Sequence, residues 1–250
     1  MPDVNKANRQ VCDVLINDLK TMKPFLSFDT ANTTTAGLSS DSVYAMAKGS
    51  RRISFTNPLE GEMKISAQVY PFKFYALLSD GVIDSTAVYA DSQTVECATA
   101  GELALTVPTN GTITAGTVFA YPADSFGDEA ALIVGTYADN KFTATNAGDI
   151  AVGSKYTVGY VINRTGVKKI AFNNSRVPKD YYITMTTVDK DEDGLLTPFK
   201  IIAYKATINR NFELSFSSEG DPAEVELSFA LMEDKDGNVL DMVELTDEAI

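Results

Sequence analysis

The sequence predicts an all-β fold with a minor N-terminal helix. Two observations support this fold class: apolar and polar residues alternate along several stretches, and short turn signals separate these stretches. Near the C-terminus, Val225, Leu227, Phe229 and Leu231 alternate with Glu, Ser and Ala. Because successive side chains of a strand point to opposite faces, this segment has one apolar and one polar face.

A second alternating segment precedes it and completes a predicted antiparallel hairpin. From Ile208 to Phe216 the even positions are apolar except Arg210, and residues 217–222 form the break between the two strands. The polar face of this hairpin is mostly acidic, and a register error of one residue would exchange the two faces. Its polar-face residues are Asn209, Asn211, Glu213, Glu224 and Glu226.

The composition predicts a folded protein without an enzymatic site. The 250 residues are 44% hydrophobic, and the net charge of −13 leaves no basic patch for tight binding of a nucleic-acid backbone. The chain has no His, which removes the commonest general base and metal ligand, and it has no phosphate-binding glycine loop or nucleophile elbow. We therefore expect no catalytic residue, no cofactor and no metal site.

One acidic segment resembles the start of a calcium site. Asp189, Asp191, Asp193 and Gly194 match the opening of a calcium-binding loop. However, position 12 of that loop would be Lys200 instead of a glutamate, and the flanks resemble strands instead of helices. We predict a solvated hairpin turn at this place.

The cysteines and the N-terminus indicate synthesis in the cytoplasm. Cys12 and Cys97 lie far apart, which favours two free, structural thiols, with a disulfide bond as the alternative. The N-terminus lacks the apolar segment of a signal peptide, and no run approaches the ~18 apolar residues of a membrane span. We expect no membrane insertion.

The N-terminal region begins with the predicted helix. Residues 4–22 carry an apolar stripe at a spacing of 3.6 residues, with Asp3 as the N-cap and Pro24 limiting the far end. This stripe packs either on the core of its own chain or on a neighbouring subunit. Residues 25–50 are dense in Thr, Ser, Ala and Asn, and they predict an extended loop or arm.

Two strands and a short helical turn follow this arm. Residues 51–57 predict one strand, and a turn separates them from a second strand that begins at residue 61. In the second strand, apolar residues occupy every second position from Met63 to Val69, which makes it a natural partner for the C-terminal hairpin. Residues 72–78 predict a buried turn or short helix.

Residues 83–165 predict an inserted module. Aromatic residues become fewer there, and short strands recur with turns between them, which suggests a small immunoglobulin-like β-sandwich. The Cys-Trp-Cys signature of true immunoglobulin domains is absent. Residues 1–82 and 166–250 would then form one discontinuous core domain. The expected strands of the module are Thr94–Cys97, Glu102–Val107, Thr117–Tyr121, Leu132–Tyr137, Lys141–Thr145 and Tyr156–Ile162.

Residues 168–241 resemble the C-terminal half of phage major tail proteins, which form tail tubes. The N-terminal segments KPFLSFDT, DSVYAMAKGS and YPFKFYALLSDG fit the same family in texture, whereas the inserted module departs most from it. The features that carry the resemblance are a strand IAF, an acidic hairpin turn, a strand that begins PFKI, the tyrosines Tyr181 and Tyr182 after Pro178, and the pair Lys205–Ala206 before the C-terminal hairpin.

The resemblance implies a structural protein of the virion tail, made in the cytoplasm of the host bacterium. Subunits of this family form hexameric rings that stack into a hollow tube. Each subunit contributes strands to an inner β-barrel through which genomic DNA passes during ejection without specific binding, and arms clasp the next ring. The implied partners are further copies of this chain and the tail sheath, tape measure and tail terminator proteins.

The resemblance also suggests roles for the residues of the C-terminal hairpin. Carboxylates on a surface that faces the lumen would repel the phosphates of the passing DNA, although a solvent-exposed sheet face is the alternative. Arg210 interrupts the apolar face, and we expect it to pair with a carboxylate at a subunit contact. The expected lumen-facing residues are Asn209, Asn211, Glu213, Glu224 and Glu226.

Two alternative functions remain open at this point. One is another β-structural protein of the virion, such as a capsid decoration or baseplate subunit. The other is a carbohydrate- or cell-surface-binding β-sandwich module. An aromatic platform on residues 83–165 would favour the second alternative, but most aromatic residues of this segment occupy strand positions that resemble a core.

Overall fold

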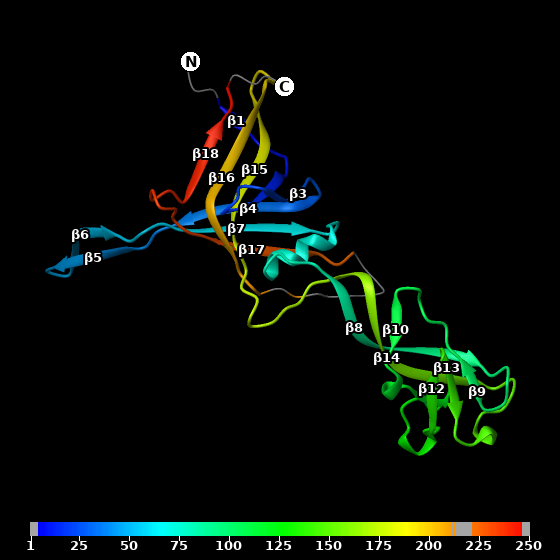
Figure 1. Ribbon diagram of the computed structural model, residues 1–250. Coiled ribbons are helices and arrows are strands. Elements are labelled where there is room, and N and C mark those ends of the chain that lie inside the picture. The colour runs from blue at the N-terminus through cyan, green and yellow to red at the C-terminus, as the bar shows by residue number, and fades with distance from the viewer. Residues whose placement is uncertain (1–4, 212, 214–221, 247–250) are drawn as a thin grey trace. The chain divides into compact units, whose positions relative to one another are not determined.

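The computed structural model divides the chain into two compact units, each with its own hydrophobic core (Figure 1). The first unit contains residues 1–82 and 172–250, and the second contains residues 83–171. Nearly every element in both units is a strand, which confirms the all-β fold class. The residues that the structure describes are 5–211, 213 and 222–246.

A nine-stranded sheet forms most of the first unit. Its strands follow the order β3-β2-β15-β16-β17-β7-β4, with β1 beside β15 and β18 beside β16. Because β3 and β4 stand at the two ends of this order, and β1 and β18 each have one described partner, the described strands form an open sheet. The strands are β1 (Lys6–Ala7), β2 (Asp13–Asp18), β3 (Pro24–Phe28), β4 (Ala31–Ser39), β7 (Glu60–Ala67), β15 (Asp180–Asp191), β16 (Leu196–Ile208), β17 (Val225–Leu231) and β18 (Leu240–Glu244).

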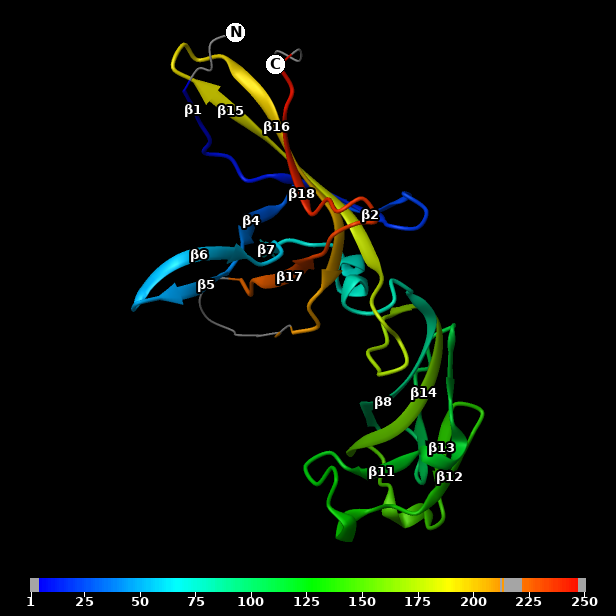
Figure 2. The same ribbon diagram turned by 90° about the vertical axis from the view of Figure 1, so that its left-hand side faces the viewer.

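The sheet folds over so that two groups of strands enclose one core. Strands β4, β7 and β17 run across the direction of β15 and β16 (Figure 1, Figure 2). The long strand β16 belongs to both groups, because residues 199–203 pair with β18 and residues 206–208 pair with β17. Buried side chains from both groups, such as Ile16 of β2 and Phe229 of β17, therefore belong to the same core.

The alternation predicted for β7 and β17 is confirmed. Val225 and Phe229 are buried in β17, Met63 and Ile65 are buried in β7, and the two strands pair in antiparallel register. The segment after β7 forms the 3-10 helix η1 (Phe72–Leu78), which buries four of its side chains as expected for a short helical turn.

The predicted N-terminal helix is wrong. This segment forms β1 and β2, and β2 pairs with β3 on one side and β15 on the other. Cys12, Val14 and Ile16 are buried at every second position, which is the spacing of a strand. The same segment also fits a helical stripe, and pairing with β15 decides between the two because it buries the β-branched Val14 and Ile16 in the core.

Residues 25–50, predicted as an extended loop or arm, form strands instead of a loop. They contain most of β3, all of β4 and the strand β5 (Ser42–Ala47), which pairs with β6 (Ser50–Thr56) in a separate hairpin. The β-branched run from Thr33 to Thr35 favours the strand conformation of β4. We call the β5–β6 hairpin the arm.

The second unit is a β-sandwich of two sheets around one core. Its larger sheet contains β8, β10, β11 and β14, and its smaller sheet contains β9, β12 and β13. Phe142 of the smaller sheet and Val158 of the larger one are buried in the same cluster. The strands are β8 (Asp84–Glu96), β9 (Glu102–Ala104), β10 (Gly111–Ile113), β11 (Phe119–Pro122), β12 (Gly135–Ala138), β13 (Lys141–Ala144) and β14 (Lys155–Lys169).

All six strands expected in this segment overlap with observed strands, whereas β10 was missed. The predicted end of the module at residue 165 lies inside β14, and the unit continues to Ala171. The two cysteines are free and buried, as expected, with Cys12 in the first unit and Cys97 in the second.

Gly135 of β12 stands where a larger residue does not fit. A Cβ atom there would lie 2.3 Å from the carbonyl oxygen of Thr143 and 2.6 Å from Cζ of Phe142. We expect Gly135→Ala to destabilise the second unit by about 1–3 kcal/mol, because the backbone of β13 would have to move. Calorimetry of the full chain would show a lowered Tm for this unit. Gly116→Ala is the matched control, since its Cβ would meet nothing within 4 Å. Equal Tm values for both variants would contradict this account.

Candidate functional site

The described residues contain no group of three or more Asp, Glu, Cys or His side chains that could hold a metal ion. The acidic segment between β15 and β16 is a hairpin turn, in which the backbone N–H of Leu195 donates to Asp191 Oδ1 at 2.7 Å. Gly194 has a φ of 89°, a conformation that glycine adopts without strain. The predicted hairpin turn is confirmed, and three other surfaces of the first unit are candidates for function.

The first surface is the outward side of β4, β7 and β17, which we call the polar face. The outward residues of these strands are exposed or half-buried, and they lie side by side in the strand register. Glu226 lies opposite Ser66, and Ser228 lies opposite Lys64. The polar face consists of Thr33, Thr35, Glu60, Glu62, Lys64, Ser66, Glu226 and Ser228.

Hydrogen bonds join side chains across the polar face. Asn209 Nδ2 donates to Ser228 Oγ at 2.7 Å, and Ser228 Oγ donates to Glu62 Oε1 at 3.1 Å. Lys64 Nζ lies 3.5 Å from the same carboxylate oxygen. These contacts connect β17 with β7 and place Asn209, just past the end of β16, beside this face.

The structure brings together some of the residues expected on one surface. Glu226 belongs to the polar face, exposed Glu224 immediately precedes β17, and Asn209 bonds to Ser228. Asn211 and Glu213 are exposed and belong to no strand.

The first strand of the predicted C-terminal hairpin is shorter than the alternation suggested. Strand β16 ends at Ile208, so the prediction of a strand through Asn209–Asn211 is wrong. Most of the remaining segment up to Phe216 lies outside the described residues. Arg210 is exposed and donates from Nη2 to the carbonyl oxygen of Asn173 at 3.2 Å. Its pairing with a carboxylate of a second subunit stays a prediction.

Two acidic residues of the polar face, Glu60 and Glu62, were not predicted from the sequence. Glu60 and Glu62 extend the polar positions of Lys64 and Ser66 at a spacing of two residues, and this continuation was the available signal. The turn expected from Pro58 onward concealed it, although β7 already begins at Glu60.

The second surface is the arm, whose two strands the rest of the described chain leaves uncovered (Figure 1, Figure 2). Every residue from 43 to 60 is exposed. The register pairs Val43 with Phe55 and Ala45 with Ile53, so these four residues share one apolar face. Val43, Ile53 and Phe55 are 57–60% exposed, and a two-stranded hairpin with such a face is marginally stable by itself.

The local sequence of the arm fixes its turn and its charge. Lys48 and Gly49 both have positive φ values, 49° and 76°, as required by a two-residue turn that matches the twist of the strands. On the face opposite the apolar one, the guanidinium of Arg51 lies 4.2 Å from the centre of the Tyr44 ring. Lys48, Arg51 and Arg52 make the arm basic, and residues 42–56 contain no Asp or Glu.

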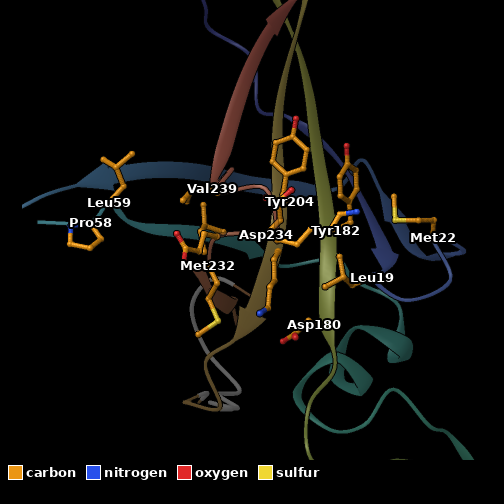
Figure 3. A pocket seen from close by; sticks show the side chains of 15 residues that line it. Leu19, Met22, Pro58, Leu59, Asp180, Tyr182, Tyr204, Met232, Asp234 and Val239 are labelled. Carbon is orange, nitrogen blue, oxygen red and sulfur yellow. The ribbon is translucent and has the colours of Figure 1, made fainter.

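The third surface is a groove of about 1210 Å³ on the first unit (Figure 3). Tyr182 and Tyr204 stand at its centre, with ring centres 5.9 Å apart and ring planes at 82°. Apolar side chains and both signs of charge surround them. The apolar lining includes Leu19, Met22, Leu59, Met232 and Val239, and the charged lining consists of Asp180, Lys205, Glu233, Asp234 and Lys235.

The sequence matches the model of the YomU/Tube protein family over residues 9–244, which includes nearly all of both units. The chain belongs to this family. The resemblance to phage tail tube proteins is thereby confirmed, and the YomU/Tube chain is a structural protein of the virion tail. None of the curated proteins matches it. Within the described part of this YomU/Tube protein, no helix has the length and apolar character that a membrane span requires.

The groove of this YomU/Tube protein contains a tyrosine with an unusual titration. Tyr204 Oη donates to Asp241 Oδ2 at 2.5 Å, and this bond, together with desolvation and the carboxylate charge, raises the pKa of Tyr204 to about 12. We expect Asp241→Ala to return that pKa toward the ordinary value of about 10. Ultraviolet difference titration would then show one tyrosine ionising at lower pH, which should not occur in the control Asp236→Ala. Identical titrations of the native protein and Asp241→Ala would refute this assignment.

Proposed function

We propose that this protein builds the tail tube as stacked rings, six subunits to a ring as the tube resemblance implies, with the polar face lining a channel for DNA. The arm is the observation that carries this proposal. It presents an apolar face that the described part of its own chain does not cover, and a second copy of the chain would cover it in a tube. Other virion roles, such as capsid decoration or baseplate, are less favoured because the family is one of tube proteins.

The arm and the groove are different surfaces of the same chain, which suits a contact that propagates. When an arm of one copy enters the groove of the next, each copy still has a free arm or a free groove. The apolar face with Val43, Ile53 and Phe55 would meet the apolar lining of the groove. Full burial of one such side chain contributes about 1.5–3 kcal/mol. The carboxylates of Asp180 and Glu233 would meet the cations of the arm.

The open edges of the nine-stranded sheet suit contacts within a ring. Strands β3 and β4 each have a described partner on one side only, and an unpaired edge exposes N–H and C=O groups that bind another strand. Pairing of these two edges from neighbouring copies would close the sheets into a barrel and remove both of them. Because β4 carries part of the polar face, that face would continue from one subunit to the next.

An acidic lining suits a channel that must release DNA. Glu60, Glu62, Glu224 and Glu226 place four carboxylates on or beside the polar face, against the single amine of Lys64. Weak attraction at every ring would accumulate along a tube and retain the DNA, whereas a negative lining repels the phosphates. In this proposal the sheath, tape measure and tail terminator proteins are further partners of the tube.

Loss of the apolar face of the arm should prevent assembly. Phe55→Ser removes a side chain that becomes buried between copies, so we expect the protein concentration required for polymerisation to rise about 10–100-fold. Sedimentation and negative-stain electron microscopy measure this concentration. Met46→Ser is the matched control, because Met46 is also 60% exposed but belongs to the opposite face of the arm. Equal assembly of both variants and the native protein would exclude the arm as the connector.

Reversing charge on the polar face should leave assembly intact and create DNA retention. We expect tubes of the double variant Glu224→Lys with Glu226→Lys to hold short duplex DNA that salt releases, because lysines bind phosphates through counterion release. Co-sedimentation of labelled DNA with tubes measures retention. The control is Glu129→Lys with Asp149→Lys, which changes the net charge equally on exposed residues of the second unit. Equal retention by both variants would show that net charge alone is responsible and would count against the channel assignment.

A further inference from the structure

One face of the larger sheet in the second unit is turned away from the core of its own β-sandwich. In β14, Tyr156, Val158 and Tyr160 are buried in that core. The residues between them, Thr157 and Gly159, therefore lie on the opposite side of the strand. Strands β8 and β11 flank β14 and continue this outward face.

Aromatic side chains gather on the outward face. Phe119 of β11 lies opposite Gly159, and Tyr121 lies opposite Thr157. The side chains of Phe119 and Tyr121 therefore lie on the outward side of the sheet. Phe126 joins them from the loop after β11, with its ring centre 5.4 Å from that of Tyr121 and the ring planes at 79°. Phe119 is 47% exposed and Phe126 is 51% exposed. We call the surface formed by Phe119, Tyr121, Phe126 and the adjacent outward positions of β8 and β14 the aromatic face.

The loop that carries Phe126 is built to hold the ring on the sheet. The N–H of Ser125 donates to the carbonyl of Pro122 at 3.0 Å, and the N–H of Asp128 donates to the carbonyl of Ser125 at 3.1 Å. The absence of a side chain at Gly159 makes room for the ring, since a Cβ there would lie 3.2 Å from Cζ of Phe126. The exposed ring is therefore positioned before any ligand arrives, which lowers the entropy cost of binding.

Hydroxyl groups, and no charges, lie beside the rings on the strands. Ser92 of β8 stands opposite Gly159, and Thr94 stands opposite Thr157, with their Oγ1 atoms 2.9 Å apart in the second pair. In the described sheet, the outward positions of β8 and β14 carry no charged side chain between the pair Glu96–Lys155 and the end of the aligned register at Thr165. The loop after β11 carries two carboxylates, of which Asp128 accepts the N–H of Ala130 and Asp124 accepts the hydroxyl of Ser125.

We propose that the aromatic face binds neutral pyranose sugars. The C–H faces of a sugar ring pack on aromatic rings, and its hydroxyls exchange hydrogen bonds with hydroxyls such as those of Ser92 and Thr94. Nucleic acid does not fit, because its phosphates require several cations, whereas up to Thr165 the outward side of β8 and β14 carries only Lys155, at its end and opposite Glu96.

The size of the aromatic face favours a small ligand over a second copy of the chain. An aromatic side chain buries about 150–250 Å² in full, so two half-exposed phenylalanines and one tyrosine offer roughly 200–300 Å². A stable protein interface requires about 800 Å² from each partner. One or two sugar rings match the smaller area.

Saturation-transfer NMR on the full chain tests this site directly. The probes are glucose, galactose, N-acetylglucosamine and their β-1,4-linked disaccharides at about 10 mM, above the millimolar Kd expected for so small a contact. We expect transfer from the protein to ring C–H protons of at least one probe. Absence of transfer from every probe would overturn the proposal.

Three variants locate the binding. Phe119→Ser with Phe126→Ser should weaken binding at least tenfold, and Gly159→Val should weaken it by displacing the Phe126 ring while leaving every aromatic residue in place. Tyr89→Ser is the control, because Tyr89 is an exposed aromatic residue that pairs with core-facing Ile162 and so belongs to the other side of the sheet. Unchanged binding in the first two variants would overturn the proposal, as would a dimer of the native protein that these variants abolish.

Discussion

The first unit depends on the burial of one side of β7 and β17. Met63 and Phe229 are fully buried between the two groups of strands, while Glu62 and Glu226 emerge on the other side of the same strands. A slip of one residue would expose the apolar side chains, each worth about 1.5–3 kcal/mol when buried, and would bury carboxylates. This constraint fixes the register and thereby determines which side chains form the polar face.

The same constraint explains which parts of the fold could be predicted from the sequence. Strands β7 and β17 have one buried and one solvated side, so their alternation is visible in the residues themselves. The N-terminal segment was misassigned because Val14 fits a helical stripe with Val11 and Leu15 as well as a strand with Cys12 and Ile16, and only the distant strand β15 decides between them. Of the two strands of the arm, β6 was predicted from residues 51–57, whereas β5 lies in the segment predicted as an extended loop or arm. Its apolar residues Val43, Ala45, Ile53 and Phe55 do alternate, but both sides of the arm are exposed within one chain, so no contact of a described residue fixes its form.

The candidate site could be predicted only in part for a related reason. Glu226 follows from alternation within one strand, whereas Glu62 joins it through pairing of segments that lie more than 160 residues apart. The groove likewise combines Leu19, Leu59 and Tyr204 from distant parts of the chain. No local sequence pattern predicts contacts between segments that lie so far apart in the chain. Contacts between subunits are not encoded in such a local pattern either.

The boundary of the second unit has a consequence for how such proteins diversify. Asp84, near its beginning, lies opposite Lys169, near its end, and their side chains form an ion pair at 4.0 Å. The chain thus enters and leaves this unit through two neighbouring strands at one edge of the unit. A shorter turn or an unrelated module could take its place between the same two strands. Recombination at this junction would change the accessory module of a tail without altering the pairing of the nine-stranded sheet.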